Sequence, residues 1–174
     1  MNRRGFTVVE MIITVTIMGI LLLLAVVNVN TSQVKARDDE RKADVAAIAA
    51  NLEAFFNTGT DGTTSFGRYP SSALADSESS IKTALRDADM KSFLAPGETE
   101  VALSFVASTN TGTSPSIQTT AGVLPQPTIS QYVYQPIKTD GSICAPGNTD
   151  CRKFNIFYRL ESDNTVYKIT SKNQ

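Results

Sequence analysis

Histidine and tryptophan are both absent from the 174 residues of this chain. Without histidine, the sequence offers neither a histidine-dependent catalytic triad nor a histidine-ligated metal site. Acidic side chains are scattered, no glycine-rich phosphate loop occurs, and no nucleophile has a recognisable partner. We therefore expect a protein that is not an enzyme and that needs no cofactor and no metal.

Cysteine is also scarce, because only Cys144 and Cys151 occur. A zinc site would need four ligands, and two cysteines without histidine do not supply them. If this part of the chain lies outside the cytoplasm, a disulfide between the two is the natural interpretation. Two unpaired thiols are the alternative that the sequence leaves open.

The chain has no excess of positive charge, since its formal net charge is -1. A general nucleic-acid binder needs a basic face. We therefore expect no specific nucleic-acid site.

Charge is missing altogether from Met11 to Val29, and the next charged residue is Lys35. As a helix, the stretch from Phe6 to Val29 would be about 36 Å long at roughly 1.5 Å per residue. That length crosses a hydrocarbon core of about 30 Å with some tilt. The exception is Glu10, a single carboxylate near the start of the apolar run. A charged side chain at such a position usually has an assigned partner.

The stretch Arg4-Gly5-Phe6-Thr7-Val8-Val9-Glu10-Met11-Ile12-Ile13 resembles the class III signal peptide of type IV pilins and the related pseudopilins. The resemblance implies that Gly5 ends a leader of residues 1–5, which a prepilin peptidase removes. It implies that Phe6 becomes the N-terminus and is N-methylated. It also implies that Glu10 pairs with the N-terminal amine at Phe6 of a neighbouring subunit.

The chemistry of a buried carboxylate agrees with this role for Glu10. In a packed bundle of helices, a carboxylate is tolerated only when it is paired and hydrogen-bonded. The alternative is an uncleaved signal anchor in which Glu10 reaches the membrane interface. Gly19 is a candidate point of helix flexibility, or an ordinary glycine of a membrane helix. Many type IV pilins carry a proline soon after this position, whereas the first proline here is Pro70.

We expect the helix to continue without a break to about Phe56. An apolar stripe with helical spacing follows the charged stretch Lys35–Lys42, and it comprises Val45, Ile48, Leu52, Phe55 and Phe56. Within the charged stretch, Lys35 can pair with Asp39 and Asp38 with Lys42 on one helix face. The region from Arg41 to Tyr69-Pro70 also resembles the pilin helix and its exit loop.

The remaining chain predicts one small α+β domain. We expect a loop at 57–67, a short helix at 79–94 capped by Ser79 or Ser80, and an exposed connection at 108–130. Strands are predicted at 101–107, 131–138, 153–161 and 165–171, with a turn at 162–164. Pro136 indicates an edge or a strand end. In the strand 153–161, one face carries Phe154, Ile156, Tyr158 and Leu160.

These elements predict an α+β fold in which a long N-terminal helix, transmembrane in its first half and amphipathic in its second, packs on a small C-terminal antiparallel sheet. The expected divisions are a leader at 1–5, a transmembrane and assembly helix at 6–29, its amphipathic continuation at 30–57 and a globular domain at 58–174. The resemblance implies the pilin architecture for this layout.

The resemblance further implies a structural subunit, most simply the major pilin of a type IV pilus, used for twitching motility, adhesion or DNA uptake. Before assembly it would sit in the cytoplasmic membrane with its C-terminal domain outside, in contact with lipid. Its partners would be other subunits and an inner-membrane platform driven by a cytoplasmic ATPase. The alternatives are a pseudopilin or minor pilin of a secretion or competence system, and a membrane-anchored extracytoplasmic binding domain.

Overall fold

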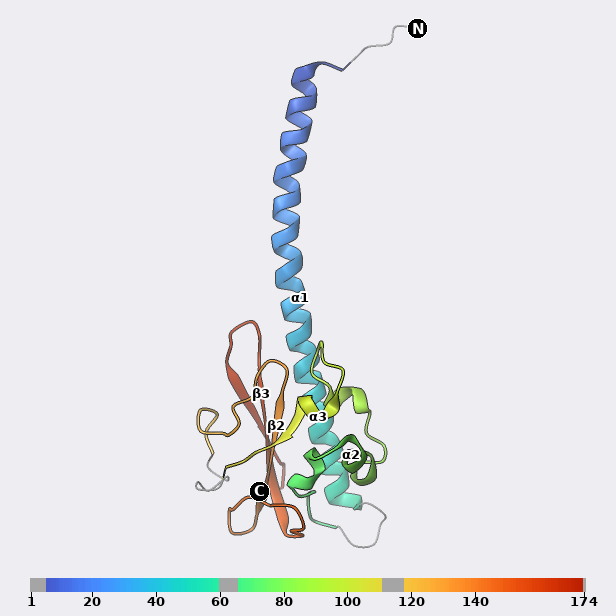
Figure 1. The fold of residues 1–174 in the computed structure, drawn as a ribbon, viewed down its shortest axis with the longest axis vertical. Helices are drawn as coiled ribbons and strands as arrows, with labels where there is room; N and C mark the ends of the chain where they lie inside the picture. Colours follow the sequence, from blue (N-terminus) through green and yellow to red (C-terminus); the bar gives the residue numbers. More distant parts are fainter. Residues whose placement is uncertain (1–5, 60–65, 111–117, 174) are drawn as a thin grey trace. The chain divides into compact units, whose positions relative to one another are not determined.

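The computed structural model describes residues 6–59, 66–110 and 118–173 of the chain. Two compact units are present, residues Met1–Ala36 and residues Arg37–Gln174. We call the second unit the head. Figure 1 shows the long helix α1, which belongs to both units, and the small sheet of the head.

Helix α1 runs from Val8 to Thr58 without interruption over 51 residues. No proline or internal pair of glycines breaks it, and its second half is rich in alanine, the strongest helix former. It ends where Gly59 adopts a positive φ of 69° and donates its backbone N–H to the Phe55 carbonyl at 2.7 Å. Glycine takes this left-handed conformation without steric cost, which is why it commonly closes a helix. The prediction of one continuous helix is confirmed.

The C-terminal part of α1 supplies one wall of the main core. Its buried positions are Val45, Ile48, Leu52 and Phe55, the stripe that the sequence predicts. They pack against the inward-facing residues of the sheet, which are Tyr132, Tyr134, Phe154, Ile156 and Tyr158, and against Leu160, which follows β3. Helix and sheet therefore bury their facing apolar sides against each other.

The sheet has four strands in the order β1-β2-β3-β4. Strands β2 (Tyr132–Lys138), β3 (Cys151–Arg159) and β4 (Val166–Thr170) are antiparallel, as the sequence predicts. Strand β1 (Phe105–Ala107) pairs parallel to β2, so the sheet is mixed. Strand β1 covers only Tyr132 to Tyr134, so Pro136 lies in the part of β2 that extends past it. The layout is the predicted α+β one, with a long apolar helix followed by a small sheet.

Two local predictions are wrong in detail. The segment predicted as a strand at 101–107 begins with a helical turn, α3 (Val101–Ser104), and only its last three residues form β1. The helix predicted at 79–94 is split into α2 (Glu78–Ala84) and the 3-10 turn η2 (Met90–Phe93). A further 3-10 turn, η1 (Ser72–Ala75), precedes α2. Residues 60–65 of the predicted loop 57–67 lie outside the described residues.

The helix cap of α2 is also not the predicted one. Ser77 is the N-cap, and its hydroxyl oxygen accepts the backbone N–H of Ser80 at 3.1 Å. A serine, threonine, aspartate or asparagine before the first helical turn satisfies one of the free N–H groups there. The sequence Ser77-Glu78-Ser79-Ser80 offers three candidate caps, and the structure selects the first.

The connection predicted as exposed at 108–130 is partly buried against the outer face of the sheet. Val123 is fully buried and packs on Val133 and Phe157, forming a second small core. Beside it, the buried Gln135 accepts a hydrogen bond from Asn155 at 2.9 Å and donates to Ser108 at 3.3 Å. This segment has no sequence period, because a few side chains rather than a regular element make the contacts.

One carboxylate near the end of α1 joins three segments of the head. Glu53 accepts hydrogen bonds from the Tyr69 hydroxyl at 2.9 Å, the Lys172 backbone N–H at 2.8 Å and the Asn173 side-chain amide at 3.0 Å. Burial raises the pKa of Tyr69 to about 12. The hydrogen bond with Asn173 opposes this shift, and the hydrogen bond to Glu53 adds to it. Parts of the chain that are distant in sequence therefore meet at Glu53.

Candidate functional site

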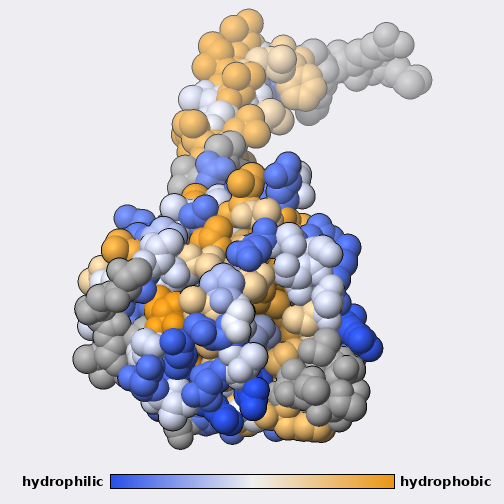
Figure 2. Space-filling model, turned by 60° about the horizontal axis from the view of Figure 1, so that its bottom comes forward, coloured by the Kyte–Doolittle hydropathy of each residue, from blue (hydrophilic) through white to orange (hydrophobic). Residues whose placement is uncertain are grey.

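The N-terminal part of α1 presents apolar side chains to its surroundings all the way round. Every described side chain from Phe6 to Leu24 is exposed, including Phe6 at 76% and Leu23 at 72%. Figure 2 shows mostly hydrophobic residues on this helical segment and a mixture of hydrophilic and hydrophobic residues on the face of the head in view. Among the described residues, α1 is the one helix long and apolar enough to cross a membrane. Such a surface is not stable in water, so lipid or other helices must cover it.

The first turn of α1 is fixed by Thr7. Its hydroxyl oxygen accepts the backbone N–H of Glu10 at 3.3 Å, and its carbonyl accepts the N–H of Met11 at 3.3 Å. The spacing Thr7-Val8-Val9-Glu10 is that of a capping box. Glu10 thus lies in the first turn, where the helix dipole favours a negative charge.

Glu10 is exposed and is paired with no cation in the part of the chain that the structure describes. Gly5, the predicted cleavage position, lies outside the described residues. Phe6 is described and precedes the helix. A carboxylate in an apolar segment is costly without a partner, and the described residues supply no cation to Glu10.

Further along this segment, polar side chains are satisfied within the helix. The Thr14 hydroxyl donates to the Met11 carbonyl at 2.9 Å, and the Thr16 hydroxyl donates to the Ile12 carbonyl. Such back-bonding removes the cost of a hydroxyl in an apolar medium. A Cβ atom added at Gly19 would meet no atom within 4 Å. Helix α1 is regular through Gly19, which remains a predicted point of flexibility.

The charged pairs that follow on α1 differ from those that the sequence predicts, and one of them is buried. Asp38 and Arg41 are each 2% exposed, and Arg41 donates to Asp38 at 2.9 Å. Asp39 accepts from Lys42 at 3.3 Å on the exposed side of the helix. Both pairs are three residues apart, whereas the sequence predicts Lys35 with Asp39 and Asp38 with Lys42.

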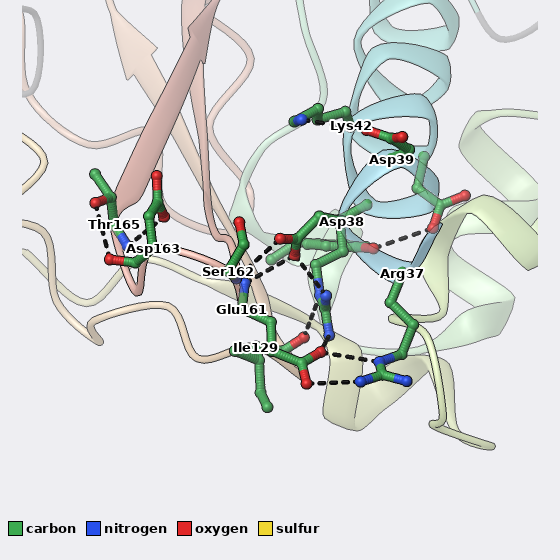
Figure 3. Close-up of polar contacts among 12 residues, drawn as sticks. Arg37, Asp38, Asp39, Lys42, Ile129, Glu161, Ser162, Asp163 and Thr165 are labelled. Carbon is green, nitrogen blue, oxygen red and sulfur yellow. Dashed lines mark hydrogen bonds and ion pairs between the residues drawn. The ribbon is translucent and has the colours of Figure 1, made fainter. Parts of the chain in front are cut away.

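Asp38 and Arg41 also reach a residue that the sequence analysis overlooks. Glu161, which follows β3, forms a two-pronged ion pair with Arg37 at 2.9 and 2.7 Å and lies 3.5 Å from Arg41. Figure 3 shows these side chains converging on the turn between β3 and β4. At least 120 residues separate the partners in sequence, so no spacing rule could have paired them.

Two carboxylates of α1 have pKa values shifted in opposite directions. Burial raises the pKa of Asp38, but hydrogen bonds from Ser162, Glu161 and Arg41 outweigh it and lower the value to about 2. For Asp44, burial dominates and raises the pKa to about 6, although the Tyr132 hydroxyl donates to it at 3.0 Å.

Cys144 and Cys151 form a disulfide in the structure. The Cys144 carbonyl accepts the Ser72 backbone N–H at 2.9 Å, and the Cys151 carbonyl accepts the Tyr69 N–H at 2.7 Å. The disulfide-bonded segment thus holds the stretch that follows α1. Within the described residues, no group of three or more cysteines and acidic residues is placed to hold a metal ion.

One comparison with known proteins finds a match. The family model described as the prokaryotic N-terminal methylation motif matches residues 1–26. No curated protein and no solved structure matches the chain significantly. The matched range contains the predicted leader 1–5, Phe6, Glu10 and the whole of the exposed apolar segment 6–24.

Proposed function

We propose that this chain, which carries the class III signal peptide of type IV pilins at residues 1–26, is the precursor of the major subunit of a type IV pilus. That the chain is a pilin-like or pseudopilin precursor follows from the motif itself. The observation that supports assembly through the helix is that the exposed apolar segment 6–24 carries one carboxylate, Glu10, without a cation in the described residues. Pilins and pseudopilins share this feature, so abundance in filaments is what distinguishes the major subunit.

In this proposal, prepilin peptidase cuts after Gly5 and Phe6 becomes the methylated N-terminus. Residues 6–29 hold the subunit in the membrane with the head outside, and later form the filament core. Residues 30–57 continue the helix, and the globular domain comprises residues 58–174. A cytoplasmic ATPase, acting through a membrane platform, lifts each subunit out of the lipid.

The physical argument concerns what favours assembly over remaining in lipid. Apolar helix surface gains little by moving from lipid to a bundle of helices, because both media are apolar. The pairing of Glu10 with the amine of Phe6 in a neighbouring subunit supplies a specific gain, because each charge is otherwise unpaired in an apolar medium. Processing and assembly are then linked, since the amine exists only after cleavage.

The mass of the natural product tests this proposal directly. We expect a chain that begins at Phe6 with one additional methyl group, and we expect Gly5→Leu to retain residues 1–5. A product that begins at Met1 contradicts the proposal and favours a membrane-anchored binding domain. Copy number in sheared surface filaments separates a major pilin, recovered in abundance, from a pseudopilin or minor pilin.

The role of Glu10 has its own test. Glu10→Ala is expected to insert in the membrane at the wild-type level but to enter filaments poorly. Thr14→Ala is the matched control, because Thr14 lies one helical turn further along and its hydroxyl is satisfied within the helix. Filaments of Glu10→Ala at the wild-type level would rule out the pairing.

A further inference from the structure

Within the head, the first two turns of α1 are attached to the other segments by charged groups rather than by buried apolar ones. Between Arg37 and Asp44, the buried side chains are Asp38 and Arg41. The first buried apolar residue of α1 is Val45. The eight residues 37–44, about 12 Å of helix at 1.5 Å per residue, therefore depend on polar contacts for their position.

These contacts form what we call the Asp38 latch: Asp38, Arg41, Glu161 and the backbone of Ser162. One carboxylate oxygen of Asp38 accepts the Glu161 N–H at 2.7 Å, and the other accepts the Ser162 N–H at 2.9 Å. Two consecutive N–H groups that each donate to one oxygen of a carboxylate form a charge-assisted, two-pronged contact, which adds geometric specificity as well as energy. The turn between β3 and β4 is thereby held at one position on α1 (Figure 3).

Arg41 completes the latch. Its guanidinium donates to Asp38 at 2.9 Å and to the Ile129 carbonyl at 2.8 Å, and it lies 3.5 Å from Glu161. Arg37, which is 38% exposed, binds Glu161 from the solvent side. Every buried charge in the latch therefore has a partner, which is the condition for placing charges in a protein interior.

A network of this kind fixes the position of the β3–β4 turn more than it adds to the free energy of unfolding. Buried ion pairs lose about as much in desolvation as they gain in attraction, whereas apolar packing carries most of the folding free energy. The stripe from Val45 to Phe55 is fully apolar and packs on the sheet. Loss of the latch should therefore leave the head folded while its β3–β4 turn moves away from α1.

We propose that Asp38 is a positioning residue for assembly: it holds the β3–β4 turn on residues 37–44 of α1, and so fixes the surface that this turn offers to neighbouring subunits. The inference rests on the proposed function, because the position of the turn on α1 matters for assembly only if subunits join through α1. In a filament built on the helices, a turn that shifts on its own helix cannot repeat the same contacts from subunit to subunit.

The test compares two neighbouring aspartates in the full chain. Asp38→Asn removes the charge and one of the two acceptor oxygens. Asp39→Asn is the matched control, because the Asp39 carboxylate pairs with the exposed Lys42 on the solvent side of the helix. Hydrogen exchange in detergent micelles reports the Glu161 and Ser162 amides, and sheared filaments from the producing cells report incorporation.

For Asp38→Asn we expect protection of the Glu161 and Ser162 amides to fall by about tenfold or more, as for loss of a charge-assisted hydrogen bond. Amides of Phe154 to Tyr158 should keep their protection, and filament yield should fall several-fold. Asp39→Asn should change neither quantity. Wild-type filament yield from Asp38→Asn, or unchanged protection of the two amides, would overturn the proposal.

A second variant covers the case in which Asp38→Asn loosens the whole head. Glu161→Gln keeps both backbone N–H contacts with Asp38 but weakens the ion pairs by which Arg37 and Arg41 also hold the turn. A reduced filament yield with β3 fully protected supports the latch, and a normal yield contradicts the latch as defined, because the definition includes these ion pairs. If the wild-type chain itself is absent from filaments, the proposed function fails and the assembly role fails with it. If wild-type filaments form and exclude Glu10→Ala, the proposed function holds. A wild-type filament yield from Asp38→Asn then counts against the latch alone.

Discussion

Asp44 is the side chain whose replacement should stabilise this protein at neutral pH. It is half-buried on α1 and accepts a hydrogen bond from Tyr132. Burial is the largest cause of its raised pKa, Glu40 and Asp89 add to it, and Lys91 opposes it. In Asp44→Asn, the amide oxygen still accepts from the Tyr132 hydroxyl, while the charge is gone.

The magnitude follows from the difference between the folded and unfolded pKa values. Asp44 has a pKa of about 6 in the fold against 3.8 in the unfolded chain. Because the folded value is the higher one, its contribution to stability is fully present below pH 3.8 and is lost as pH rises through about 6. The loss at neutral pH is about 3 kcal/mol at most. Asp44→Asn should remove this loss.

The assay is chemical denaturation of the full chain in detergent at a series of pH values from 4 to 8. Asp44→Asn and wild type should be closest in stability near pH 4, and the variant should gain progressively up to pH 7. Asp39→Asn, an exposed aspartate earlier on α1, should show no such trend. A stability difference that is constant across this pH range would refute the reasoning.

Three further predictions concern the stability of the head. Asp38, with its pKa lowered to about 2, stabilises the fold above pH 4, and about 2 kcal/mol should be lost as pH falls through 2; acid denaturation of Asp38→Asn should lack this step. Reducing the Cys144–Cys151 bond, which spans seven positions, should cost about 2.5 kcal/mol by loop entropy, measured by denaturation with and without reductant. Ile48→Ala, at a fully buried position, should cost about 2–5 kcal/mol, whereas the exposed Ala46→Ser should cost under about 1 kcal/mol.

The elements with a regular period were predictable from the sequence, and those built on single contacts were not. The apolar stripe of α1 and the alternation in β3 repeat often enough to indicate both the element and its buried face. Segment 108–130 has no such repeat, so its contact through Val123 with the outer face of the sheet was missed. Parallel pairing of β1 depends on where a distant strand lies, which local propensity does not encode.

For the candidate site, the N-terminal motif was visible because its residues are adjacent in sequence. The Asp38 latch was not, because its halves lie on α1 and beyond β3. The charged run 35–42 matches a solvated helix face by every local rule. One local signal existed in hindsight: Asp38, Arg41 and Val45 follow one another at helical spacing on the buried side.

The contacts of Glu53 join the end of α1 to the C-terminal end of the described chain. Its bond to the Lys172 backbone spans 119 residues, so it cannot form until residue 172 has been synthesised. Contacts of such long range are made late and slow the folding of a chain. The residues that cover the apolar stripe of α1, from Tyr132 to Leu160, precede residue 172, so the stripe can be covered before the Glu53 contacts close the C-terminal end of the chain.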